Sequence, residues 1–111
     1  MLKTWVAKVA AGLSAAALLC LLSPVARAQG AGEKTYKAKC AACHGADGAG
    51  QTPVAKTLGV RSFCAPEVKK ETPAEMAEIT AKGKDKMPAY EKQLSPAEIK
   101  DVVAYLRTLC K

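Results

Sequence analysis

Cys40-Ala41-Ala42-Cys43-His44 is the stretch that decides the fold of this 111-residue chain. A Cys-x-x-Cys-His run is the attachment signature of a c-type haem. Two thiols three residues apart lie on one side of a helical turn, where each can form a thioether with a haem vinyl group. The histidine is the only one in the chain, and neutral imidazole is a good ligand for haem iron. The sequence therefore predicts one haem c, held by the two cysteines, with the histidine as proximal ligand.

Two other uses of the cysteine pair are disfavoured. A structural zinc ion needs four ligands, and Cys40, Cys43, Cys64 and Cys110 offer four thiols. The last two are 46 positions apart, however, and do not form a second Cys-x-x-Cys. A thioredoxin-like dithiol would lie within a βαβ pattern, for which the sequence has no strand signals. Haem is therefore the favoured interpretation of this motif, and a non-haem metal module is the alternative.

The first 28 residues have the organisation of a secretory signal peptide. Lys3 and Lys8 give a positive start, residues 9–22 form an uncharged apolar run, and residues 26–28, Ala-Arg-Ala, resemble a cleavage site. A retained membrane anchor is disfavoured, because the 14-residue apolar run is shorter than the roughly 20 residues that a spanning helix needs. The sequence predicts a signal peptide at residues 1–28 and a periplasmic protein.

Residues 29–111 are expected to form a single small domain. Its 83 residues are too few for a large apolar core, and a covalently held haem would fill the centre. These residues include 14 basic and 10 acidic side chains, a formal charge of +4. A moderately positive surface suits docking to an acidic patch on a partner protein. Nucleic-acid binding is disfavoured, because aromatic residues do not alternate with the basic ones.

Helical signals dominate this domain. Residues 31–43 are expected to form a first helix, with Gly32, Tyr36 and Cys40 on its buried face. Frequent glycine makes residues 45–59 an expected loop without regular structure.

Capping boxes followed by proline mark two later helices, which begin after Thr72 and after Ser95. Gly83 is expected to end the first of these. Residues 84–90 are expected to be extended, because Pro88 disfavours helical geometry at the residue before it. The last helix carries an apolar stripe at helical spacing, formed by Ile99, Val102, Val103, Leu106 and Leu109.

The haem motif, the later residues 86–90, Lys-Met-Pro-Ala-Tyr, and a capped terminal helix with Tyr105-Leu106 together resemble the class I c-type cytochromes. The likeness is to the small monohaem carriers of bacteria and photosynthetic organisms, and it covers residues 32–109. It implies an all-α cytochrome c fold, in which several short helices surround one covalently attached haem. Two features depart from the family pattern: residues 29–111 lack tryptophan, and the pair Cys64 and Cys110 is extra.

The resemblance also implies the axial ligands of the iron, which would be His44 and Met87. The other internal methionine, Met76, lies three residues before Ile79 in an expected helix, where core packing is favoured. A proline carbonyl holds the histidine Nδ1–H in this family, and Pro53 is the candidate here. The first and last helices of the family cross at a glycine and aromatic residues, roles matched by Gly32, Tyr36, Val102 and Tyr105.

Histidine and methionine together would leave the iron no open position, which favours electron transfer over catalysis. We therefore expect an exported, monomeric one-electron carrier between redox proteins, which reaches membranes only through its partners. A haem enzyme or gas-binding haem protein with an open iron site is the alternative. Lys82, Lys84 and Lys86 precede Met87 and are expected either to orient an acidic partner or to form an ordinary solvated loop.

The two cysteines outside the haem motif are expected to form a disulfide. Once Cys20 leaves with the signal peptide, Cys64 and Cys110 are the remaining pair in an oxidising compartment. Such a bond would tie the end of the last helix to the segment after the haem loop, with a role in stability. Two free thiols are the alternative.

Overall fold

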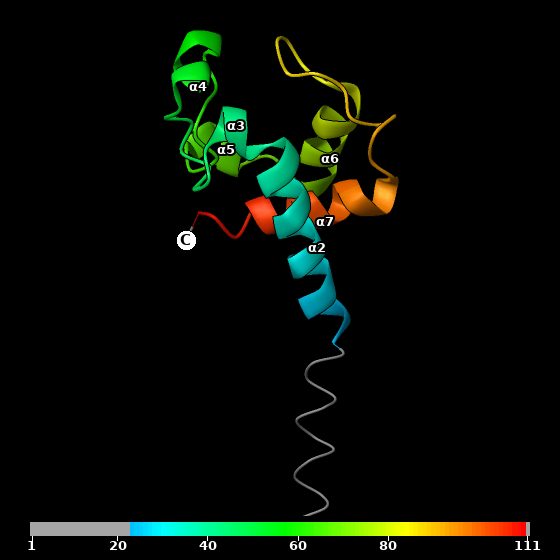
Figure 1. Cartoon of the computed structure of the whole chain (residues 1–111). Coiled ribbons are helices and arrows are strands. Elements are labelled where there is room, and N and C mark those ends of the chain that lie inside the picture. Colours follow the sequence, from blue (N-terminus) through cyan, green and yellow to red (C-terminus); the bar gives the residue numbers. More distant parts are fainter. Residues whose placement is uncertain (1–22, 111) are drawn as a thin grey trace, which may run out of the picture.

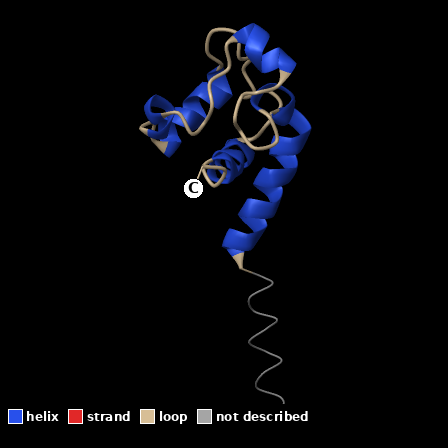
Figure 2. Ribbon diagram, turned by 90° about the vertical axis from the view of Figure 1, so that its left-hand side faces the viewer, coloured by secondary structure: helices blue, strands red, loops and turns tan. Residues whose placement is uncertain are grey.

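The computed structural model describes residues 23–110, which form six helices joined by loops (Figures 1 and 2). The helices are α2 (Pro24–Lys39), α3 (Ala41–His44), α4 (Pro53–Leu58), α5 (Pro66–Lys69), α6 (Pro73–Lys82) and α7 (Pro96–Leu106). Within this part of the chain the only β-type pairing is an isolated bridge between Lys84 and Met87. The predicted all-α class is confirmed.

Reciprocal capping explains where the two best-predicted helices begin. At the start of α6 the Thr72 hydroxyl accepts a hydrogen bond from the Glu75 backbone at 3.1 Å, and the Glu75 carboxylate accepts one from the Thr72 backbone at 2.7 Å. Ser95 and Glu98 repeat this arrangement at the start of α7. Each box satisfies backbone N–H groups that a helix start leaves without partners. Both predicted starts are confirmed.

The core is built where α7 crosses α2 (Figure 1). At the crossing the Gly32 backbone lies against Asp101, and a Cβ at Gly32 would overlap the Asp101 carbonyl and come within 3.0 Å of the Tyr105 Cβ. Tyr36 and Val102 are fully buried beside it. Only glycine allows this close approach of two backbones, so the expected crossing residues are confirmed.

Several expected boundaries are wrong. The helix expected at residues 31–43 begins earlier, at Pro24, and is divided at Cys40 into α2 and α3. Residues 45–59 are not wholly irregular, because α4 forms within them. The Thr52 hydroxyl accepts a hydrogen bond from the Ala55 backbone at 3.0 Å, and Gly59 ends the helix in a left-handed conformation. The cap therefore outweighs the helix-breaking composition of this loop.

The expected signal peptide extends over residues 1–28, and residues 1–22, with Cys20, lie outside the described residues. Helix α2 runs through the expected cleavage point, and its residues before Gly32 are mostly exposed. Among residues 23–110, no helix has the length and apolar character needed to cross a membrane.

Candidate haem-binding site

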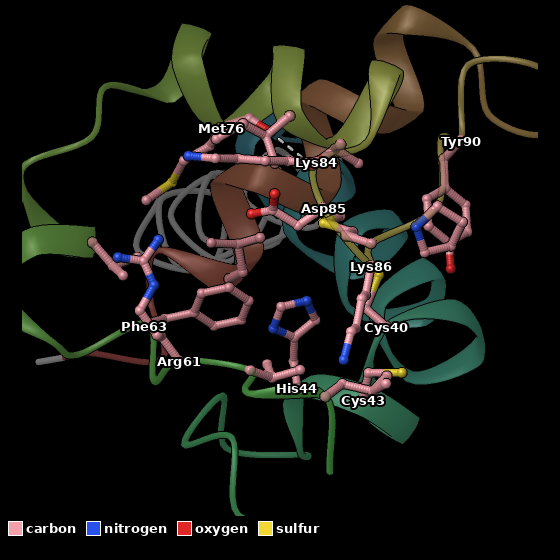
Figure 3. A pocket seen from close by; sticks show the side chains of 18 of the residues that line it. Cys40, Cys43, His44, Arg61, Phe63, Met76, Lys84, Asp85, Lys86 and Tyr90 are labelled. Carbon is pink, nitrogen blue, oxygen red and sulfur yellow. Dashed lines mark hydrogen bonds between the residues drawn. The ribbon is translucent and has the colours of Figure 1, made fainter. Parts of the chain in front are cut away.

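A pocket of about 260 Å³ lies between the end of α2 and α3 on one side and α6 with its following turn on the other (Figure 3). Its walls include the haem motif residues Cys40, Cys43 and His44, and also Met87. These residues are up to 47 positions apart in the sequence. The fold thus brings all four predicted haem residues to one cavity.

Hydrogen bonds fix the backbone around the haem motif. The His44 N–H donates to the Cys40 carbonyl at 2.9 Å, and the His44 carbonyl accepts from Gly50 N–H at 2.9 Å. The Thr52 hydroxyl donates to the Cys43 carbonyl at 3.2 Å. The helix break at Cys40 and the loop after His44 therefore hold the motif as one rigid unit at the pocket wall.

The His44 imidazole has an environment that suits a ligand. Burial lowers its pKa, so the neutral ring prevails at neutral pH, and neutral imidazole is the form that binds metal. Its Nδ1 is buried and has no hydrogen-bond partner within the described residues. The expected bond to the Pro53 carbonyl is absent there, and that carbonyl accepts a hydrogen bond from the Thr57 hydroxyl at 3.1 Å, within α4.

The two motif cysteines are free thiols at the pocket wall. Burial raises the pKa of the Cys40 thiol to about 11, and the neighbouring Cys43 contributes to the rise. Cys64 and Cys110 are instead joined to each other in a disulfide, with their Cα atoms 5.2 Å apart. The four cysteines therefore do not form one cluster, which weighs against the zinc alternative.

Met87 reaches the pocket from a tight turn rather than from the extended segment expected at residues 84–90. Lys84 and Met87 exchange backbone hydrogen bonds at 3.2 and 2.9 Å, and Asp85 between them has a positive φ of 53°. Aspartate tolerates this left-handed conformation better than most side chains, and the turn forms on that account. The Tyr90 N–H then donates to the Thr80 carbonyl at 3.0 Å, which anchors the turn to α6.

Met76 also lines the pocket, but its surroundings differ from those of Met87. It is 8% exposed and belongs to the core, as its helical position predicts. Its sulfur accepts a 3.6 Å hydrogen bond from Arg107, whose guanidinium also donates to the Glu71 carbonyl. Met87 is more exposed than Met76, and its sulfur has no hydrogen bond among the described residues.

The three lysines before Met87 lie in different places. Lys82 is paired with Glu78 on α6 at 3.3 Å, whereas the exposed Lys84 and Lys86 line the pocket. Figure 3 shows the Lys84 side chain on the α6 side of the pocket, across from His44. Lys39 and Arg61 line the pocket as well, so its basic residues come from several segments and not only from the three lysines before Met87.

Two aromatic residues lie at the site without a role assigned from the sequence, although Tyr90 ends the quoted motif of residues 86–90. The Tyr90 hydroxyl donates to the Lys39 carbonyl at 3.2 Å and so joins the Met87 segment to the haem motif. The Phe63 ring stacks on His44, with centroids 4.6 Å apart and planes inclined by 18°. Phe63 is the only phenylalanine in the chain, and its local sequence contains no sign of this contact.

Three comparisons show which known proteins this chain resembles. Residues 27–106 match the family described as cytochrome C oxidase, cbb3-type, subunit III. The chain is 42% identical over 76 residues to the cytochrome c6 of Leptolyngbya boryana, which covers 68% of this chain and 86% of that protein. It also resembles the solved structure of the KustC0563 c-type cytochrome, with 32% identity and a TM-score of 0.66 over 72% of this chain and 98% of that one.

The helical fold around a Cys-x-x-Cys-His pocket defines a haem protein with covalent attachment. The chain belongs to the class I c-type cytochromes, as its sequence pattern predicted. Its cofactor is a covalently bound haem c, and its single attachment motif makes it a monohaem electron carrier.

Proposed function

We propose that Cys40 and Cys43 form the thioethers to the haem and that His44 and Met87 are the axial ligands of its iron. The convergence of these residues on one pocket carries this proposal, because His44 and the Met87 turn approach the pocket from different elements. The neutral His44 ring and the free Cys40 and Cys43 thiols support it. Met76 is the less suitable methionine, because its sulfur is already engaged by Arg107.

The bound haem iron supplies one-electron chemistry by alternating between its ferric and ferrous states. The chain's own residues would hold the haem through Cys40 and Cys43 and would place His44 and Met87 at its iron. With both His44 and Met87 bound, the iron would have no position left for a substrate, and the methionine thioether would favour the ferrous state. We therefore propose a role in electron transfer without enzymatic turnover.

We further propose that the protein is exported to the periplasm and acts as a monomer between redox proteins. Its amino-terminal sequence supports export, as does the Cys64–Cys110 disulfide, because such bonds persist in oxidising compartments. The exposed Lys84 and Lys86 at the pocket support docking to acidic patches on its partners. Membranes would be reached only through those partners.

Absorption spectra of the purified holoprotein in both redox states test the ligand assignment. We expect a low-spin haem c with histidine–methionine ligation, and no binding of exogenous ligands at neutral pH while Met87 is in place. Ready binding of such ligands to the wild-type protein would favour the alternative, a haem enzyme or gas-binding protein.

Extraction with acidified organic solvent tests the covalent attachment separately. Haem should stay on the wild-type chain and be lost from a Cys40→Ser/Cys43→Ser variant. A matched Cys64→Ser/Cys110→Ser variant removes two other cysteines and should retain its haem. Stable wild-type protein from which all haem is extracted would contradict the thioether assignment.

A further inference from the structure

Phe63 is the side chain that lies flat against His44. The two rings are 4.6 Å apart and nearly parallel, inclined by 18° (Figure 3). A proximal histidine is ordinarily oriented by a hydrogen bond to its second ring nitrogen. Here the buried Nδ1 has no such partner within residues 23–110. The stacked phenyl ring is therefore the contact that restricts rotation of the imidazole.

Phe63 is itself held in place from several directions. Its backbone N–H donates to the Gly48 carbonyl at 2.9 Å, and its ring packs at 6.3 Å from the Tyr36 ring. A Cβ at Gly48 would lie 2.6 Å from the Phe63 ring and 3.2 Å from the Leu109 side chain. The Phe63 and Leu109 side chains therefore both pack against the backbone of Gly48, in the loop that follows the haem motif.

The disulfide joins the residues that follow these two side chains. Cys64 comes directly after Phe63, and Cys110 comes directly after Leu109. The bond closes a loop of 46 residues at the place where both side chains meet Gly48. It therefore limits how far Phe63 can move away from the haem loop, in addition to any effect on the unfolded chain.

We propose that Phe63 is a positioning residue that sets the orientation of the His44 imidazole, and that the Cys64–Cys110 disulfide holds Phe63 in that position. The proposal rests on the proposed role of His44 as axial ligand. Contacts outside the ligand set fix the ring orientation of a metal-binding histidine and tune the redox potential of the metal, so loss of the Phe63 ring would be expected to alter both. The disulfide thus gains a second role beside stability.

Paramagnetic NMR of the ferric holoprotein tests this directly, because the pattern of haem methyl shifts reports the orientation of the axial imidazole. Phe63→Leu keeps an apolar side chain but removes the flat ring. We expect it to retain histidine–methionine ligation while changing the order or spread of the methyl shifts and moving the midpoint potential. Phe63→Tyr keeps a six-membered ring and should restore the wild-type pattern.

A matched control separates orientation from loss of stability. Leu94 is 6% exposed, belongs to the core and does not line the pocket. Leu94→Ala should lower the melting temperature and leave the methyl shifts unchanged. If Phe63→Leu behaves in the same way as this control, Phe63 serves packing alone and the proposal is wrong.

The coupling to the disulfide is tested by a double-mutant comparison. Cys64→Ser/Cys110→Ser should shift the methyl pattern in the same direction as Phe63→Leu, but by less. Adding the serine pair to Phe63→Leu should produce no further shift, because the ring through which the bond acts is gone. If the serine pair shifts the methyl pattern equally in the wild type and in Phe63→Leu, the disulfide does not act through the Phe63 ring and this part of the proposal is wrong.

The serine pair and Phe63→Tyr keep the test valid even if Phe63→Leu fails to incorporate haem. An unchanged methyl pattern in the serine pair would then count against the proposal. The wild-type spectrum shows whether an error lies in the role of Phe63 or in the proposed axial ligands. A wild-type protein without histidine–methionine ligation refutes the ligand assignment, whereas normal wild-type ligation with insensitive methyl shifts refutes only the role of Phe63.

Discussion

The Tyr36 hydroxyl donates a buried 2.6 Å hydrogen bond to the carbonyl of Gly45, the residue after His44. Tyr36 is fully buried at the crossing of α2 and α7, so this bond connects the helical core to the proximal wall of the haem pocket. Tyr36→Phe would leave the Gly45 carbonyl without this donor. We expect a loss of about 1–3 kcal/mol in the free energy of unfolding, measured by denaturant titration.

Tyr90→Phe is the control for this variant. It removes a longer and exposed bond, 3.2 Å to the Lys39 carbonyl, which water can replace. Its cost should be clearly smaller than that of Tyr36→Phe. Equal losses of unfolding free energy in the two variants would show that burial does not strengthen the Tyr36 hydrogen bond.

The same tyrosine gives a prediction for alkaline pH. Burial raises the pKa of Tyr36 well above its ordinary value of 10.0, with smaller contributions from Cys40 and Tyr105. A raised folded-state pKa contributes stability that is complete below pH 10 and is lost as pH rises toward the folded pKa. The stability advantage of wild type over Tyr36→Phe should therefore shrink above pH 10. A constant difference between pH 7 and pH 12 would contradict this.

The two methionines of the pocket should respond differently to truncation. Met87→Ala is expected to open a coordination position, lower the midpoint potential and allow external ligands to bind the iron. Met76→Ala should cost about 2–5 kcal/mol of stability, the usual range for a buried methionine, with little change in the iron spectrum. Spectra and unfolding curves of both variants decide the matter. A spectrum controlled by Met76 would show that the distal ligand has been assigned to the wrong residue.

The crossing of α2 and α7 should be intolerant of a single methyl group. Gly32→Ala places a Cβ on the Asp101 carbonyl, so the helices must separate, at a cost of about 1–3 kcal/mol or more. Gly30→Ala lies on the same helix, where a Cβ meets nothing within 4 Å, and should cause no loss. Thermal unfolding of the two variants provides the measurement. Similar melting temperatures for both would argue against close packing at this crossing.

Electron transfer to an acidic partner should slow as salt rises, because ions screen charges over about 8–10 Å near physiological ionic strength. Lys84→Glu/Lys86→Glu should reduce the association rate and weaken its salt dependence, with less effect on the potential. Lys34→Glu/Lys100→Glu makes the same change in net charge at exposed positions that do not line the pocket, and should have less effect. Equal rates for the two variants, measured by stopped flow, would favour the ordinary solvated loop.

The disulfide should be detectable chemically and by its effect on stability. Intact mass after alkylation of the unreduced, unfolded holoprotein should show that neither Cys64 nor Cys110 is modified. Closing a loop over a separation of 46 residues corresponds to about 4 kcal/mol in the chain-entropy estimate. Reduction should lower the melting temperature, while the visible spectrum keeps its histidine–methionine features. Two alkylated thiols without reduction would rule out the bond.

Local sequence patterns were sufficient for the haem motif and the capped starts of α6 and α7, whereas the resemblance to the class I c-type cytochromes supplied the residues of the helix crossing. For the motif and the caps the information lies in short spacings: two residues separate the thiols, and two residues separate the members of each capping box. Apolar residues likewise recur every three or four positions along a helix face. Such spacings act within one or two helical turns, so they do not depend on the rest of the chain. The family and its cofactor followed from these patterns.

The tertiary structure decided what depends on distant contacts. The turn that carries Met87 is held by the Thr80 carbonyl and by the Tyr90 bond to Lys39, neither of which has a local signal. Helix α4 is an exception, because its cap is local: Thr52 precedes Pro53 and accepts a hydrogen bond from the Ala55 backbone, and the glycine content of residues 45–59 concealed that signal. The stacking of Phe63 on His44 requires the loop after α4 to close on α3. Contacts of this kind join separate segments of the chain, so they depend on the tertiary packing and leave no pattern in the local sequence.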